Sequence, residues 1–189
     1  MDLKQAKELI GGQFSFMADS VEKIVKHLAL NKDSKILDIG TGIGKMAIIL
    51  ALHGYKVLTG EPMDDDTEYA KQDWRENAKK VGVDHLISFK FFNAETMPFD
   101  DESFDAVFIF GSFHHFKDKE VTLKECFRVI HFDGLVCIIE PSKKNIEIIK
   151  KRRNNHPDHA DPKDFVGKLP VKIEHQGDSE IDAYLITKK

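Results

Sequence analysis

The sequence predicts an α/β fold, with a mostly parallel sheet of about seven strands, helices on both faces and a C-terminal antiparallel hairpin. Two observations carry this prediction. Short apolar runs alternate with helical segments over residues 35–154, an order that favours a parallel sheet covered by helices. Two β-like segments, near 171–175 and 181–187, are joined by a short turn, and so short a connection permits only an antiparallel pair.

The composition is typical of a globular protein with a sizeable core. Hydrophobic residues make up 41% and charged residues 32% of the 189 residues, unlike a disordered or membrane-spanning chain. No repeat, low-complexity tract or linker divides the sequence, so we expect a single domain over residues 1–189. Residues 1–34 are expected to be its N-terminal helical segment, because apolar residues recur there at helical spacing.

Charge and hydropathy restrict the partners and the location. A net charge of −4 at pH 7 disfavours broad affinity for nucleic acid or an anionic membrane. No apolar run approaches the roughly 20 residues of a membrane-spanning helix, and the polar N-terminal sequence lacks the apolar stretch of a secretory signal. We therefore expect a cytoplasmic protein, in which Cys126 and Cys137 are unpaired residues of the core.

The remaining elements follow from local patterns. Strands are expected at residues 35–39, 56–59, 86–92, 104–110 and 135–140, and helices at 45–53, about 66–80, 117–130 and about 143–154. Gly54 marks the end of the first of these helices. The pair Asp133-Gly134 predicts a tight turn that leads into the fifth strand.

A glycine-rich loop follows the first predicted strand and precedes a predicted helix. Ligands of open α/β sheets bind at the carboxyl ends of strands, where glycine lets the backbone turn sharply and approach a ligand. The glycines are Gly40, Gly42 and Gly44, with Thr41 between the first two and Asp38 before them. A dinucleotide-binding fingerprint would place its third glycine at position 45, which is a lysine.

This spacing resembles the first motif of class I S-adenosylmethionine-dependent methyltransferases, a family with a Rossmann-like fold. The resemblance implies that the loop wraps the methionine and ribose parts of the cofactor. It also implies that Asp38 holds either the loop or the cofactor's amino group. The alternative is a tight strand-to-helix turn that binds no ligand.

Two later segments resemble further motifs of the same family. Glu61 ends the second predicted strand, where an acidic side chain can accept hydrogen bonds from both ribose hydroxyls. The resemblance also assigns Pro62 and Met63 to the cofactor site and implies that Met63 packs on the adenine. The segment from Asn93 to Phe99 resembles D-A-E-x-L-P-F, so the resemblance assigns Asn93, Ala94 and Glu95 to the cofactor site. An asparagine in place of the usual aspartate still offers an acceptor to the adenine amino group, and we expect weaker adenine binding.

The segment from Ser103 to Phe116 resembles the family's S-F-D-x-V strand and the loop that faces the transferred methyl group. The resemblance therefore implies that Gly111 and Ser112 contact the cofactor near that group. His114 and His115 follow directly and are the candidate catalytic residues, because histidine titrates close to neutrality. The alternative is that one histidine packs under the loop and the other is solvated.

Three other segments could be functional or could have only a structural role. Residues 156–161 (HPDHAD) carry metal-ligand types but read as a flexible loop, so no metal site is expected. Residues 150–153 (KKRR) could contact RNA phosphates, although a solvated helix end is the simpler interpretation. The apolar cluster at 13–17 is either a lid over the cofactor or an anchor to the core.

The resemblance implies a methyltransferase that uses S-adenosylmethionine, releases S-adenosylhomocysteine and acts on a small-molecule acceptor that its motifs do not identify. No dedicated base is required, since the cofactor carries the reactive group and the protein orients the reactants. One alternative is a non-catalytic module or partner subunit that binds S-adenosylmethionine. A weaker alternative, disfavoured by Lys45, is a nicotinamide-dependent oxidoreductase.

Overall fold

The computed structural model describes residues 1–64, 73–153 and 155–189. The chain forms two compact units, residues 1–93 and 94–189. Its seven strands have the sheet order β3-β2-β1-β4-β5-β7-β6. The predicted α/β fold, with mostly parallel strands and an antiparallel C-terminal hairpin, is confirmed. The extent of the domain stays a prediction.

The first unit contains a parallel three-stranded portion of the sheet with β2 in its middle. Its helix α4 is apolar all round and almost wholly buried against α3, β2 and β3, as expected of a helix inside a core. The elements are α1 (Leu3–Ile10), α2 (Gly12–Ser15), α3 (Ala18–Leu28), β1 (Ile36–Ile39), α4 (Lys45–Leu52), β2 (Val57–Gly60), α5 (Trp74–Lys80), the 3₁₀ turn η1 (Asp84–Leu86) and β3 (Ile87–Phe89).

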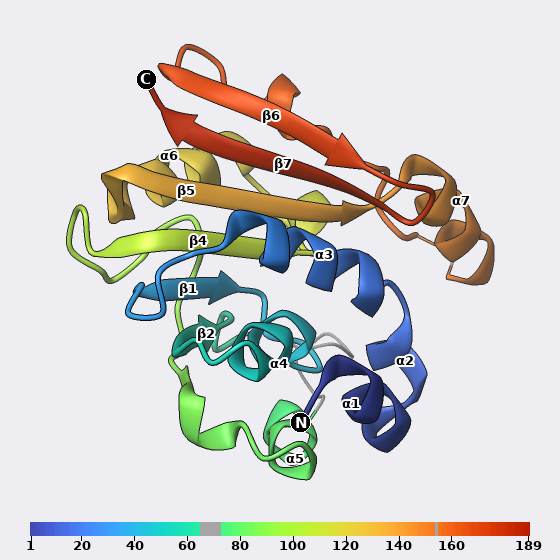
Figure 1. Cartoon of the computed structure of the whole chain (residues 1–189). Helices are drawn as coiled ribbons and strands as arrows, with labels where there is room; N and C mark the ends of the chain where they lie inside the picture. Colours follow the sequence, from blue (N-terminus) through green and yellow to red (C-terminus); the bar gives the residue numbers. More distant parts are fainter. Residues whose placement is uncertain (65–72, 154) are drawn as a thin grey trace. The chain divides into compact units, whose positions relative to one another are not determined.

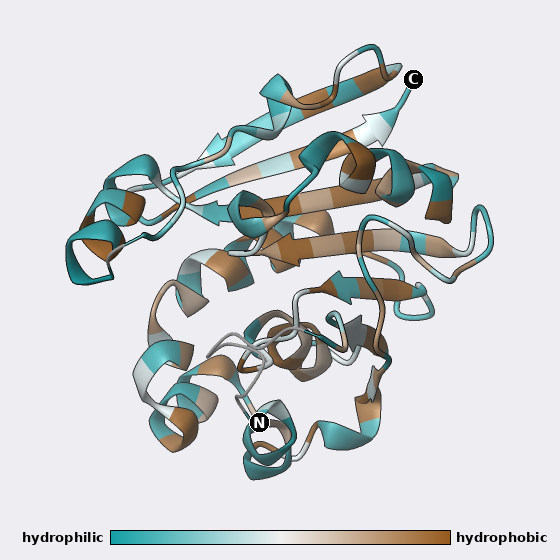
Figure 2. Cartoon of the chain, turned by 180° about the vertical axis from the view of Figure 1, so that it is seen from behind, coloured by the Kyte–Doolittle hydropathy of each residue, from teal (hydrophilic) through white to brown (hydrophobic). Residues whose placement is uncertain are grey.

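In the second unit β4 and β5 run parallel, whereas β7 is antiparallel to both β5 and β6 (Figure 1). Strand β4 is apolar over most of its length (Figure 2), which fits a strand buried on both faces. The elements are β4 (Phe104–Phe110), η2 (Phe113–His115), α6 (Lys119–Val129), β5 (Ile130–Pro141), α7 (Lys143–Arg152), η3 (Pro162–Asp164), β6 (Val171–Gly177) and β7 (Ile181–Lys188).

The third strand is shorter than the predicted 86–92. Leu86 belongs to the 3₁₀ turn η1, and the strand ends at Phe89. Beyond it the backbone keeps single hydrogen bonds, from Lys90 N to Thr59 O at 3.0 Å and from Phe92 N to Glu61 O at 3.1 Å. These bonds hold residues 90–92 beside the end of β2 without extending the ladder.

The predicted tight turn at Asp133-Gly134 is wrong, because both residues lie inside β5. The strand begins at Ile130, which pairs with Phe104, and the next pair is Leu135 with Ala106. The residues between the two pairs form a bulge. A Cβ on Gly134 would lie 3.0 Å from the carbonyl oxygen of Asp105, a tight contact, so glycine relieves crowding in the bulge.

Two predicted helices extend into residues that the structure does not describe. Of the helix predicted at 66–80, residues 66–72 lie outside the described residues, and α5 starts at Trp74 because Asp73 Oδ1 accepts the N–H of Glu76 at 3.0 Å. The basic helix α7 ends at Arg152, and residue 154 is outside the described residues. Among the described helices, none combines the length and apolarity that crossing a membrane requires.

Both cysteines are free and fully buried, as predicted. Burial raises the pKa of each thiol, because the apolar surroundings disfavour the thiolate. Neither thiol is therefore a nucleophile in the folded protein.

We predict that Gly60→Ala destabilises the protein by about 3 kcal/mol, because the new Cβ would overlap the carbonyl oxygen of Lys90 and the ring of Phe92. Gly54→Ala is the control. A Cβ there meets nothing within 4 Å, but φ is +82°. The expected loss of stability is therefore only about 1 kcal/mol, from a left-handed backbone that alanine disfavours. Urea unfolding measures the free energy of unfolding of both variants. Equal losses of stability in the two variants would contradict the steric role of Gly60.

Candidate functional site

The predicted glycine loop connects β1 to α4 in the first unit. Gly40, Gly42 and Gly44 have φ angles of 91°, 48° and 80°, which residues other than glycine rarely adopt. The N–H of Gly40 donates to the carbonyl of Gly60 at 2.9 Å and fixes the start of the loop to β2. A Cβ at Gly42 would meet nothing within 4 Å, so the backbone there is open to a ligand.

Asp38 lies at the end of β1 and is only 1% exposed. Its Oδ2 accepts the hydroxyl of Thr59 at 2.8 Å. Thr59 and Thr41 lie 2.9 Å apart through their hydroxyl oxygens, and since Thr59 gives its proton to Asp38, Thr41 is the donor of that pair. Asp38 Oδ1 is buried and has no hydrogen-bond partner among the described residues. A buried acceptor without a donor is costly, and a ligand N–H would satisfy it.

The pKa of Asp38 is raised to about 7. Burial is the main cause, because it disfavours the carboxylate, and the nearby charge of Glu61 acts in the same direction. The hydrogen bond from Thr59 opposes both effects only in part. In the ligand-free protein this carboxyl group therefore changes charge close to neutral pH.

Glu61 follows β2 and is 9% exposed. Its Oε2 accepts the N–H of Gly42 at 3.3 Å, so the carboxylate lies against the glycine loop. Pro62 is half-buried, and Met63 is 78% exposed. The structure thus groups Glu61 with the loop residues, while Met63 has an apolar side chain in solvent.

The N-terminal apolar cluster divides into buried and exposed residues. Phe14 and Met17 are buried in the core, whereas Phe16 is 44% exposed. Lys45, the residue after Gly44, is buried and donates Nζ to the carbonyl of Phe16 at 2.7 Å. The segment is therefore anchored beside the glycine loop, and its role as a lid stays a prediction.

The remaining predicted cofactor residues belong to two different units. Asn93, exposed, ends the first unit, and Ala94, buried, begins the second. Glu95 Oε1 accepts the N–H of Asp118 at 2.9 Å, at the start of α6. Gly111 has a φ of 61° and donates its N–H to Ile139 at 2.8 Å. Ser112 is half-buried in the loop after β4.

The two candidate catalytic histidines have opposite surroundings. His114 is buried, and its Nδ1 forms a short contact with Oε2 of Glu140, a fully buried residue of β5. Glu140 Oε1 accepts the N–H of Phe113 at 3.1 Å. His115 is exposed. Sequence reasoning missed Glu140, although a charged residue at the end of an apolar strand is a signal that could have identified it.

His156 joins these histidines from the segment after α7. Its ring centroid lies 5.0 Å from that of His114 and 5.1 Å from that of His115. Burial lowers the pKa of His156, and repulsion from His114 and Arg153 adds to this effect. The imidazole is therefore mainly neutral at pH 7.

The loop at 156–161 does not act as one group of ligands. His156 lies beside η2, but Asp158 is exposed and pairs with Lys150. His159 lies 3.5 Å from Asp182 through Nε2 and Oδ2. The pairing of Lys150 also neutralises part of the basic run at 150–153.

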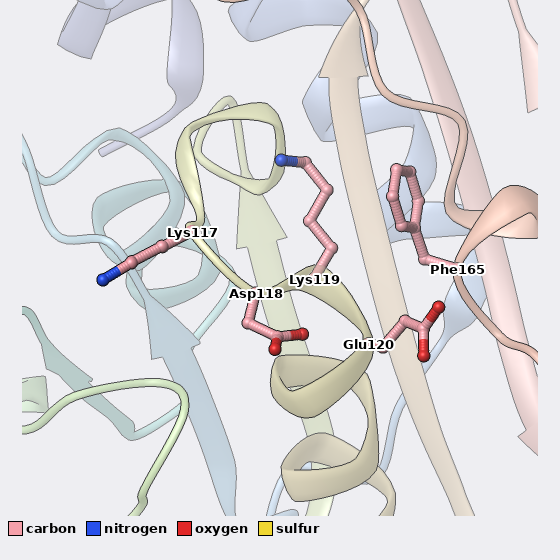
Figure 3. A pocket seen from close by; sticks show the side chains of 5 residues that line it. All are labelled: Lys117, Asp118, Lys119, Glu120 and Phe165. Carbon is pink, nitrogen blue, oxygen red and sulfur yellow. The ribbon is translucent and has the colours of Figure 1, made fainter.

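A surface pocket of about 360 Å³ lies at the start of α6. Its lining residues are Lys117, Asp118, Lys119, Glu120 and Phe165. Lys119 Nζ donates to the carbonyl of Phe116 at 2.8 Å and lies 5.6 Å from the centroid of the Phe165 ring, while Lys117 points away from that ring (Figure 3). The charges are mixed, and the pocket contains none of the predicted site residues.

Comparisons with known proteins support the assignment to a methyltransferase family. The model of a family described as methyltransferase domain matches residues 37–138. A sarcosine/dimethylglycine N-methyltransferase of Halorhodospira halochloris is 34% identical over 131 residues, which are 66% of this chain and 46% of that protein. The ubiquinone/menaquinone biosynthesis C-methyltransferase UbiE of Cronobacter sakazakii is 28% identical over 147 residues, 76% of this chain and 56% of that protein.

The chain thus spans about half the length of the curated relatives that it matches. Among solved structures, a SAM-dependent methyltransferase from Aquifex aeolicus has a TM-score of 0.67 and 18% identity, with 98% of each chain covered. That likeness shows the fold. The family match includes the glycine loop, Glu61 and β4, and it extends over more than half of the sequence. The chain therefore belongs to the methyltransferase domain family.

Proposed function

We propose that the protein is an S-adenosylmethionine-dependent methyltransferase that acts on a small-molecule acceptor. One relative is named a sarcosine/dimethylglycine N-methyltransferase and another a ubiquinone/menaquinone biosynthesis C-methyltransferase, and these names support a small-molecule acceptor. A role in nucleic-acid binding has no support from the net charge of −4. The cytoplasmic location stays a prediction.

The buried Oδ1 of Asp38 is the observation that carries the proposal. This oxygen has no hydrogen-bond partner among the described residues, and it lies on the residue that precedes the glycine loop. The methionine part of S-adenosylmethionine carries an ammonium group, which donates hydrogen bonds to a carboxylate strongly. The site therefore offers the acceptor that this ammonium group needs, and the residues fit the cofactor.

Glu61 supplies the second recognition contact. Its carboxylate is buried against the N–H of Gly42, so its position is fixed before a ligand arrives. A carboxylate at the end of the second strand can accept hydrogen bonds from both hydroxyls of a ribose. The open backbone at Gly42 gives the cofactor access to the loop without a side chain in its path.

When bound, the cofactor supplies an activated methyl group on a sulfonium sulfur. The chain's own residues then act by binding and orientation, since holding two reactants in line accounts for much of the barrier that enzymes lower. A base is required only for an acceptor that must lose a proton. His114 and His115 stay the predicted candidates for that step.

Isothermal calorimetry with S-adenosylmethionine, S-adenosylhomocysteine and NAD tests the proposal. We expect saturable micromolar binding of both sulfur compounds and none of NAD, because the glycine spacing does not match a dinucleotide site. If neither sulfur compound bound, the proposed cofactor would be contradicted. Binding without turnover of a broad acceptor panel would favour the non-catalytic module, and competition by NAD would favour the oxidoreductase.

We predict that Glu61→Ala weakens binding of S-adenosylhomocysteine by roughly 1–3 kcal/mol, the usual scale for losing hydrogen bonds to a charged group. Glu76→Ala is the control, because Glu76 is exposed and pairs with Lys80 on the surface of α5. Calorimetry at constant pH compares both variants with the wild type. An unchanged affinity for Glu61→Ala would remove this residue from the ribose site.

The pKa of Asp38, about 7 in the free protein, predicts a pH-dependent affinity. The ligand's ammonium group favours the ionised carboxylate, so binding must release a proton wherever free Asp38 is protonated. Affinity should therefore rise between about pH 5 and 7, by at most about tenfold per pH unit. Asp38→Asn should bind more weakly and lose this rise.

Calorimetry at pH 6 in buffers of different ionisation enthalpy measures the released proton directly. We expect close to one proton per ligand for the wild type and none for Asp38→Asn. Equal proton release in both proteins would show that another group titrates and that Asp38 does not receive the ammonium group.

A further inference from the structure

Three histidines from two separate segments of the second unit face one another. His114 and His115 lie in η2, directly after β4, and His156 lies after α7. One ring nitrogen from each can be chosen so that all three lie within 4.8 Å of one another. Tetrahedral zinc with bonds of about 2.0–2.1 Å needs nitrogens roughly 3.3 Å apart. Metal binding would therefore require side-chain rotations that bring the nitrogens closer together.

The hydrogen bonds orient two of the rings for ligation. His114 contacts Glu140 through Nδ1, and His156 Nδ1 lies 3.0 Å from the carbonyl oxygen of Pro157. A carbonyl can only accept, so His156 carries its proton on Nδ1, and Nε2 presents a lone pair. A histidine that binds a metal through one nitrogen donates from the other to a carboxylate or carbonyl in the same way.

The buried end of the cluster contains an atom that needs a partner. His114 has 2% of its side chain exposed, and its Nε2 has no hydrogen-bond partner among the described residues. Glu140, 0% exposed, places a carboxylate behind the same ring. A cation at Nε2 of His114 would satisfy this nitrogen, and Glu140 behind the ring would orient the ligand.

We propose that His114, His115 and His156 bind one divalent transition-metal ion, with Glu140 as a positioning residue. Imidazole ligands suit zinc, copper, nickel or iron and disfavour magnesium and calcium, which prefer oxygen. Three protein ligands leave a coordination position for water or another small ligand, and the exposed His115 gives that position access to solvent. A nitrogen that holds the metal cannot accept a proton, so this role excludes the same atom as a general base.

The test uses the full chain without an affinity tag, freed of metal by a chelator. Cobalt(II), followed by its visible absorption, and zinc, followed by calorimetry, are titrated into the protein. We expect one equivalent of each to bind, and we expect His156→Ala and His115→Ala to weaken zinc binding at least about 100-fold. Glu140→Gln should weaken it about 10–100-fold, the usual effect of removing a residue that orients a ligand.

His175→Ala is the matched control. His175 and His159 both lie beside Asp182, at 2.9 Å and 3.5 Å, in a separate histidine–carboxylate group of this unit. We expect His175→Ala to bind zinc as the wild type does. If His175→Ala lost zinc binding while His156→Ala kept it, the assignment would be overturned. Failure of the wild type to take up one equivalent of zinc would also overturn it.

Thermal unfolding separates lost ligation from lost folding. Zinc should raise the unfolding temperature of the wild type, because a ligand that binds only the folded state stabilises it. His156 is half-exposed, so the metal-free His156→Ala protein should unfold near the wild-type temperature and show no shift with zinc. A shift equal to that of the wild type would contradict the proposal. None of these measurements depends on S-adenosylmethionine.

Discussion

The buried carboxyl group of Asp38 is the constraint around which the first unit is organised. It lies near the end of β1, and its hydrogen bond from Thr59 ties it to the neighbouring strand β2, while Thr41 extends the same chain of hydroxyls into the glycine loop. The loop can approach these groups because its glycines adopt left-handed backbone angles. Strand ends and loop are thus fixed together before any ligand binds.

The same burial that fixes this carboxyl group makes it sensitive to charge. Removal from water raises its pKa into the neutral range, and one of its oxygens is left without a donor among the described residues. Interior positions of this kind are costly for stability and are therefore typical of functional sites. A cationic ligand would recover both costs at once, by donating a hydrogen bond and by favouring the ionised form.

The second unit repeats this principle with different chemistry. Glu140, like Asp38, is a buried acid near the carboxyl end of a strand, but its partner is an imidazole, not a hydroxyl. The ring of His114 carries this orientation to its buried Nε2, beside His115 and His156. In both units a buried acid thus fixes the geometry of a neighbouring side chain, which is how a preorganised site is built.

Local patterns in the sequence determined the alternating elements, the glycine loop and the C-terminal hairpin, because periodicity and turn length act over neighbouring residues. They were wrong about Asp133-Gly134, where pairing with β4 draws a turn-forming pair into a strand. Only the tertiary structure decided that Asp38 is desolvated and that His156 lies beside His114. Desolvation and contacts between distant segments depend on how the chain packs, and apolar periodicity shows which face of an element is buried but not which distant segment it meets.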